Sequence, residues 1–119
     1  MSEESALSFR KLVSAMRTNE KEYWAHRDKK MLRQSIELEK RVDSIIMKAD
    51  GNDVPQNDNG TFFLLVAELR ASTIQYFQEK KKPLPDKELV NSLFKTIKEK
   101  ETKIDKMLIR LKDEQIKKD

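Results

Sequence analysis

Residues 9–17 read FRKLVSAMR, and residues 62–70, 53 positions later, read FFLLVAELR. Apolar side chains occupy the same places in both stretches at intervals of three and four, which is the spacing of one face of an α-helix. The closing arginine recurs as well, as Arg17 and Arg70. The two stretches therefore predict amphipathic helices that open two copies of one unit.

A second similarity links the later part of each copy, at a displacement of 62. There the residues Glu39, Val42 and Asp43 correspond to Glu101, Ile104 and Asp105. The nine residues by which the displacements differ lie around the sequence KKKPLPDK at 80–87. Two unrelated amphipathic helices can also align by chance, and that is the alternative. The shared polar residues favour a duplicated helical hairpin.

Three breaks divide the periodic segments. DGNDVPQNDNG at 50–60 and PLPD at 83–86 combine prolines with Asp, Asn or Gly, which favour turns, and Asp86 can cap the following helix. The third break, HRDKK at 26–30, contains neither Gly nor Pro, although Asp28 can serve as an N-cap. Helices are therefore predicted over 3–27, 29–49, 61–81 and 87–116. A single rod of about 47 residues, roughly 70 Å long, remains the alternative to the first hairpin.

These elements predict an all-α protein, a four-helix antiparallel bundle built from two repeated helical hairpins. It forms a single domain with hairpin one at 1–49, a loop at 50–60 and hairpin two at 61–119. One hairpin alone leaves its apolar face uncovered, whereas two can cover each other. Antiparallel neighbours also predict structural ion pairs Arg17–Glu39 and Arg70–Glu101.

Composition excludes several classes of function. The 119 residues include no cysteine, one histidine and two glycines, which excludes thiolate metal sites, ferritin-like di-iron sites and glycine-rich phosphate loops. The longest apolar run, 62–67, is far shorter than the ~20 residues of a membrane span. The N-terminal residues lack the pattern of a secretory signal. The sequence therefore predicts a cytoplasmic protein with no cofactor, no small-molecule substrate and no membrane partner.

Three groups of side chains are candidates for function. Carboxylates one helical turn apart, Glu39/Asp43 and Glu101/Asp105, could bind Mg²⁺, but interleaved Lys and Arg favour ion-paired helix flanks. The lysines near the second connection could contact nucleic acid or simply be solvated: Lys80, Lys81, Lys82 and Lys87. An aromatic pair ends each first helix, and core packing at the end of the bundle is the favoured interpretation. The alternative is an exposed partner patch of Trp24, Tyr76 and Phe77.

Residues 16–46 also resemble a pattern in small proteins encoded by Bacteroidales bacteria and their phages and mobile elements. In that pattern a Met-Arg, a Gln/Glu-Lys-x-Tyr-Phe/Trp and an Arg precede a Leu-Glu-x-x-Val-Asp helix. The matching residues are Met16, Arg17, Glu20, Lys21, Tyr23, Trp24, Arg27, Leu38, Glu39, Val42 and Asp43. The resemblance covers about 9–46 directly and 62–108 only through the repeat. It implies a helical fold and a phage or mobile-element setting, and it assigns no activity and no site.

The sequence as a whole predicts a non-enzymatic helical protein-interaction or scaffold module, with self-association as one form of that function. The alternative is a nucleic-acid-binding accessory protein that uses the lysine-rich hairpin tip.

Overall fold

The computed structural model describes residues 2–49 and 54–118, with side chains for all of these except residues 3 and 112–118. Over that part it contains four α-helices and no strand: α1 (Glu3–His26), α2 (Lys29–Lys48), α3 (Asp58–Lys80) and α4 (Lys87–Lys118). The all-α prediction is confirmed, and the predicted helix bounds differ from these by at most three residues. Residues 50–53 of the predicted connecting loop lie outside the described residues.

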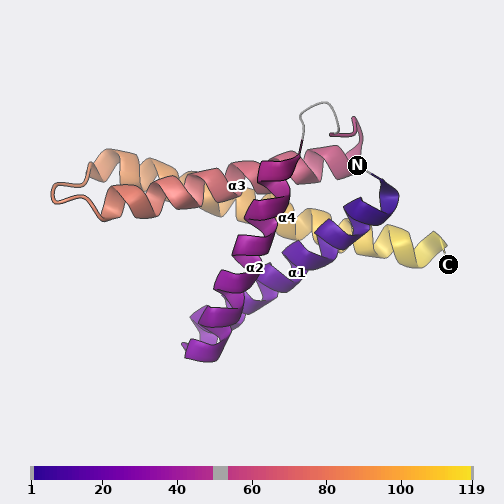
Figure 1. Ribbon diagram of the computed structural model, residues 1–119, viewed down its shortest axis with the longest axis horizontal. Coiled ribbons are helices and arrows are strands. Elements are labelled where there is room, and N and C mark those ends of the chain that lie inside the picture. The colour runs from indigo at the N-terminus through magenta and orange to yellow at the C-terminus, as the bar shows by residue number, and fades with distance from the viewer. Residues whose placement is uncertain (1, 50–53, 119) are drawn as a thin grey trace. The chain divides into compact units, whose positions relative to one another are not determined.

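The chain divides into two compact units, Met1–Gly60 and Thr61–Asp119. In the first, α1 and α2 run antiparallel and pack side by side (Figure 1). The turn between them is Arg27, in the left-handed region (φ 55°), followed by Asp28, whose carboxylate accepts a hydrogen bond from the Lys30 N–H (2.8 Å). Asp28 is therefore the N-cap that the sequence predicts. The first helices form a hairpin, and the single-rod alternative is wrong.

The second unit is the hairpin of α3 and α4, which also run antiparallel in contact (Figure 1). Asp86 caps α4 as predicted, because its carboxylate accepts hydrogen bonds from the N–H groups of Glu88 (3.1 Å) and Leu89 (3.2 Å). The connection before it contains Pro83 and Pro85, neither of which can continue α3 with a helical N–H bond.

Helix α3 begins at Asp58, three residues earlier than predicted. The Asn57 side chain accepts hydrogen bonds from the N–H groups of Asn59 (3.0 Å) and Gly60 (3.3 Å), so it supplies a cap that the sequence pattern placed inside a loop. A β-carbon on Gly60 would lie 1.6 Å from the Pro55 carbonyl oxygen. Glycine is required here because the preceding chain passes directly against the first turn of the helix.

The predicted repeat reappears in the burial of the side chains. Five pairs of equivalent residues are at most 8% exposed: Phe9 and Phe62, Val13 and Val66, Met16 and Leu69, Arg17 and Arg70, Val42 and Ile104. Even the arginines, which usually stay in water, share the same buried position. The two hairpins are therefore built on the same arrangement of core side chains. The packing of both hairpins into one bundle stays a prediction.

Candidate functional site

Each hairpin carries an aromatic pair near the end of its first helix, with a cation over one ring. In hairpin one, Tyr23 and Trp24 have ring centroids 5.6 Å apart, and the Arg27 guanidinium lies 4.4 Å from the Trp24 centroid. In hairpin two, the Tyr76 and Phe77 centroids are 5.2 Å apart. Tyr23, Trp24 and Arg27 form the aromatic tip of hairpin one, and Tyr76, Phe77 and Lys80 form the aromatic tip of hairpin two.

The cation is repeated as well as the rings. Lys80 is the residue equivalent to Arg27 at the displacement of 53, and its ammonium lies 5.2 Å from the Tyr76 ring centroid. Such contacts of a cation with an aromatic face contribute about 0.5–1 kcal/mol at exposed sites. The cation over the tyrosine ring is therefore repeated, since Arg27 also lies 5.7 Å from the Tyr23 centroid, and Arg27 lies over the Trp24 ring in addition.

The prediction that the aromatic pairs pack in the core is wrong for the second ring of each pair, Trp24 and Phe77. Trp24 is 62% exposed and Phe77 is 52% exposed, whereas Tyr23 and Tyr76 are half-buried. Consecutive helical residues point about 100° apart, so only one ring of each pair can face the neighbouring helix. The alternative from the sequence, a partner patch of Trp24, Tyr76 and Phe77, stays a prediction for each hairpin separately.

The four lysines near the second connection fall into two kinds. Lys82 forms a 2.7 Å ion pair with Glu79, and Lys80 lies over the Tyr76 ring. Lys81 and Lys87 are exposed and have no ion-pair partner among the residues described. The predicted basic tip thus retains two lysines whose charge is not already engaged.

Glu79 ties this connection together. Its carboxylate is 8% exposed, pairs with Lys82 and accepts a hydrogen bond from the Asp86 N–H (3.0 Å). These interactions, the Lys82 hydrogen bond foremost, hold the pKa of the Glu79 carboxyl below its ordinary value, although burial alone would raise it. Glu79 therefore stabilises the turn only while it is ionised.

Two side chains of the predicted interhelical ion pairs, Arg17 and Glu101, also form ion pairs within their own helices, and these do not test the interhelical ones. Arg17 lies 3.4 Å from Glu20 on its own helix, and Glu101 lies 3.4 Å from Lys98 on its own helix. Arg17–Glu39 and Arg70–Glu101 stay predictions.

The carboxylates considered for Mg²⁺ lie one turn apart on their own helices, Glu39 and Asp43 on α2 and Glu101 and Asp105 on α4. Among the described residues, no group of three or more His, Cys, Asp or Glu side chains is arranged to hold a metal ion. The same part of the chain has no helix with the length and hydropathy needed to cross a membrane.

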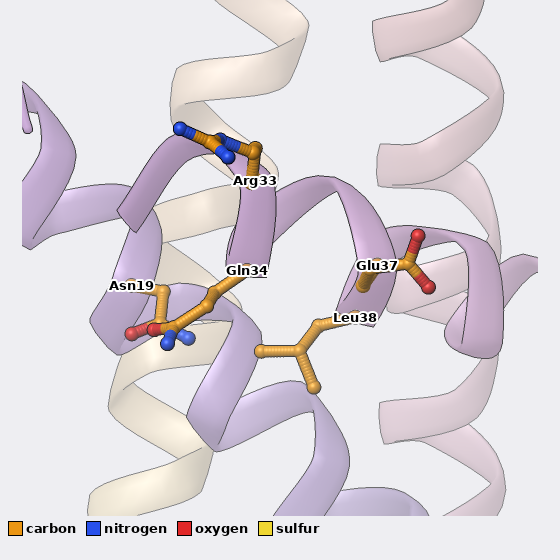
Figure 2. Close-up of a pocket in the computed structure, with 5 residues that line it drawn as sticks. All are labelled: Asn19, Arg33, Gln34, Glu37 and Leu38. Carbon is orange, nitrogen blue, oxygen red and sulfur yellow. The ribbon is translucent and has the colours of Figure 1, made fainter. Parts of the chain in front are cut away.

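A groove runs between α1 and α2, and it contains two hollows that share Leu38. The larger, of about 740 Å³, is lined on its apolar side by Phe9, Leu12, Ala15, Leu38 and Ile45. The smaller, of about 400 Å³, is lined by Asn19, Arg33, Gln34, Glu37 and Leu38. Figure 2 shows Leu38 pointing toward α1 while Arg33 and Glu37 point away from it. These residues form the α1–α2 groove.

At the equivalent place in hairpin two, two of the five apolar lining residues are replaced by charged ones. Ala15 and Leu38 correspond to Glu68 and Lys100, which form an ion pair from α3 to α4. Sequence reasoning did not single out the groove, because Leu12, Leu38 and Ile45 all fit the general apolar stripe. The sequence signal that could have identified the groove is a difference between the copies, because Ala15 and Leu38 align with the complementary charges of Glu68 and Lys100.

Comparisons of the chain with protein-family models, with curated proteins and with solved structures gave no match. The resemblance to small proteins of Bacteroidales and their mobile elements therefore stays an expectation.

Proposed function

We propose that this chain is a non-enzymatic protein-interaction module that binds partners through its aromatic tips. The observation that carries the proposal is the exposure of Trp24 and Phe77 at the same position of each hairpin. Large aromatic side chains lose contact with water favourably when a partner covers them, and Trp, Tyr and Arg are the residues most enriched at interface hot spots. Arg27 lies over the Trp24 ring, so an arginine and a tryptophan are presented together on one surface.

The same arrangement in both hairpins supports an interaction surface over a local accident of sequence. Each tip presents one exposed ring, one half-buried tyrosine and one cation. In each hairpin the half-buried tyrosine contacts the exposed ring, and in hairpin one Arg27 also lies over that ring, which restrains it before binding and lowers the entropy lost on association. A cytoplasmic location and a phage or mobile-element setting are part of this proposal and rest on the sequence alone.

The test replaces the exposed rings. Trp24→Ser, Phe77→Ser and the double variant are compared with wild type by sedimentation velocity over a range of concentrations and by quantitative cross-linking in cells of the source organism. We expect self-association or cross-linked partners to be reduced by each single variant and lost in the double variant. Met47→Ser is the matched control, because Met47 is 85% exposed and lies outside the tips. Equal loss in the control, or no loss in the double variant, contradicts the proposal.

Nucleic-acid binding is the second candidate, and the hairpin-two tip favours it. Lys81 and Lys87 are exposed and unpaired in the described part of the chain and flank the turn that follows exposed Phe77. Aromatic faces and free cations together suit single-stranded bases and phosphates. Fluorescence anisotropy with labelled single-stranded and duplex DNA and RNA tests it. Binding that weakens with salt, and with a shallower salt dependence in Lys81→Glu/Lys87→Glu, would support this candidate. No affinity at about 50 mM salt rejects it.

A further inference from the structure

The α1–α2 groove has the dimensions of a binding site for a third helix. Its lining extends along α1 from about Ser5 to Asn19, a length of roughly 21 Å at 1.5 Å per residue, and the apolar part of that lining on α1 is Phe9, Leu12 and Ala15 near its middle. Ala15 leaves room beside Leu12 and Leu38, so a side chain from outside can enter between the helices. A helix of about four turns matches this length.

Two of the apolar lining side chains, Ala15 and Leu38, are not needed to hold a hairpin of this kind together. Hairpin two has the same buried core positions, yet it carries the Glu68–Lys100 ion pair where hairpin one has Ala15 and Leu38. Charged side chains are thus compatible with the fold at this place. Apolar residues line this place in the first hairpin, and a groove lined in this way is unfavourable in water unless something covers it.

The charges beside the groove specify the occupant. Lys11 and Arg41 line the larger hollow and Arg33 lines the smaller one, and none of the three has an ion-pair partner among the described residues. Two acids also line the groove. Glu37, in the smaller hollow, lies 3.9 Å from Lys40, and Glu4, in the larger hollow, is near the N-terminal end of α1. The rim therefore presents three free cations against one free carboxylate. A second copy of the chain, with a net charge of +4, is a poor complement to it.

We infer that the α1–α2 groove binds an amphipathic helix of another protein whose apolar stripe is flanked by Asp and Glu. The stripe fills the groove against Leu12, Leu38 and Ile45, and the flanking carboxylates pair with Lys11, Arg33 and Arg41. This is the helix-in-groove mode of recognition, in which apolar residues at i, i+3/i+4 and i+7 give affinity and rim charges give specificity. The site is additional to the aromatic tips and does not depend on them.

The decisive variant copies hairpin two into hairpin one. Ala15→Glu/Leu38→Lys places the complementary charges of Glu68 and Lys100 across the groove. We expect unchanged helix content and a folded thermal transition, but no groove for a third helix. Ala71→Glu/Thr102→Lys introduces the same charges at exposed positions of hairpin two and is the matched control.

The probe is a displayed library of 18-residue helical peptides, with apolar residues at heptad positions and Glu, Gln or Lys at the flanking positions. Peptides are selected on the full chain and ranked by anisotropy against wild type and both double variants. We expect selected peptides to be rich in flanking Glu and to lose at least about tenfold in affinity for Ala15→Glu/Leu38→Lys, with no loss for the control.

Charge reversal keeps the test informative if the first double variant does not fold. Arg33→Glu/Arg41→Glu leaves the apolar lining in place, and we expect it to prefer Lys-flanked over Glu-flanked peptides. Selection of Lys-flanked peptides by wild type, peptides indifferent to every groove variant, or a chain dimer abolished by Ala15→Glu/Leu38→Lys would each overturn the inference. Trp24→Ser/Phe77→Ser should retain peptide binding, so failure at the tips and failure at the groove are distinguishable.

Discussion

The two hairpins share their buried side chains and differ in what they do at the surface and at the turn. Val42 and Ile104 are both fully buried, and so are Val13 and Val66, whereas the groove position of Leu38 is taken by Lys100 in the second copy. The turn differs as well, with two residues in hairpin one and six, including two prolines, in hairpin two. The core of a duplicated hairpin therefore constrains the fold, while positions at its edge are available for binding.

The strongest test of that comparison is a matched pair of core truncations. Phe9→Ala and Phe62→Ala each remove a ring that is at most 2% exposed. We expect each to lower the free energy of unfolding by about 3–5 kcal/mol, because a large cavity replaces the ring, and the two losses to agree within about 1 kcal/mol. Urea denaturation followed by circular dichroism measures both. A loss below 1 kcal/mol in only one hairpin would break the equivalence.

The entry to hairpin two should be the next most sensitive point. Gly60→Ala sets a methyl group against the Pro55 carbonyl oxygen, so the chain before α3 must move. We expect a loss of about 1–3 kcal/mol, as for other overpacked sites. Thermal denaturation is the measurement, and Thr61→Ala at the exposed next residue is the control. A neutral or stabilising Gly60→Ala would show that Pro55 does not approach the helix this closely.

A buried serine gives a prediction of the opposite sign. Ser35 is 3% exposed, its hydroxyl has no hydrogen-bond partner among the described residues, and its equivalent in hairpin two is Ile97. Ser35→Ala removes an unsatisfied polar group and adds a better helix former, so we expect a gain of about 1 kcal/mol. Ile97→Ser should instead destabilise. Loss of stability on Ser35→Ala, measured by urea denaturation, would point to a hydrogen bond at this hydroxyl.

The smallest effect concerns the turn that only hairpin two possesses. The lowered pKa of Glu79 means that its stabilising effect is complete above the ordinary value of 4.5 and is lost as pH falls through the lower value of the folded state. We expect Glu79→Gln to lower the melting temperature slightly at neutral pH, and the gap from wild type to close as the pH is taken below that range. Glu99→Gln, at an exposed carboxylate in the middle of α4, is the control. A gap that persists at low pH would contradict an ionised Glu79 as the stabilising species.

Much of this architecture was predictable from sequence, for local reasons. Asp28 and Asp86 mark helix starts because a carboxylate can accept the free N–H groups of a first turn, and the spacing of apolar residues identified the buried faces. The turn at Arg27 was harder to predict, because an arginine in the left-handed region carries none of the signal that glycine gives. The early start of α3 was missed because Asn57 and Gly60 also fit a loop.

The candidate sites were less predictable. Adjacent aromatics such as Tyr23 and Trp24 cannot both face the core, but the stripe alone does not say which one turns outward. The groove could be recognised only by comparing the two copies, because Leu38 fits the pattern of an ordinary core residue until it is aligned with Lys100. Sequence patterns predict which face of a helix is apolar better than they predict how much of that face stays uncovered.

Distances within each hairpin test the central claim, that the two halves are the same paired-helix unit. The chain has no cysteine, so spin labels can be attached at Ser8→Cys/Ser44→Cys in hairpin one and at the equivalent Thr61→Cys/Lys106→Cys in hairpin two, all exposed positions. Pulsed electron–electron double resonance then measures both separations. If the two halves are the same unit, both pairs of labels give similar short distances. Separations that differ widely between the pairs, or that approach the ~54 Å and ~68 Å of uninterrupted helices, would contradict it.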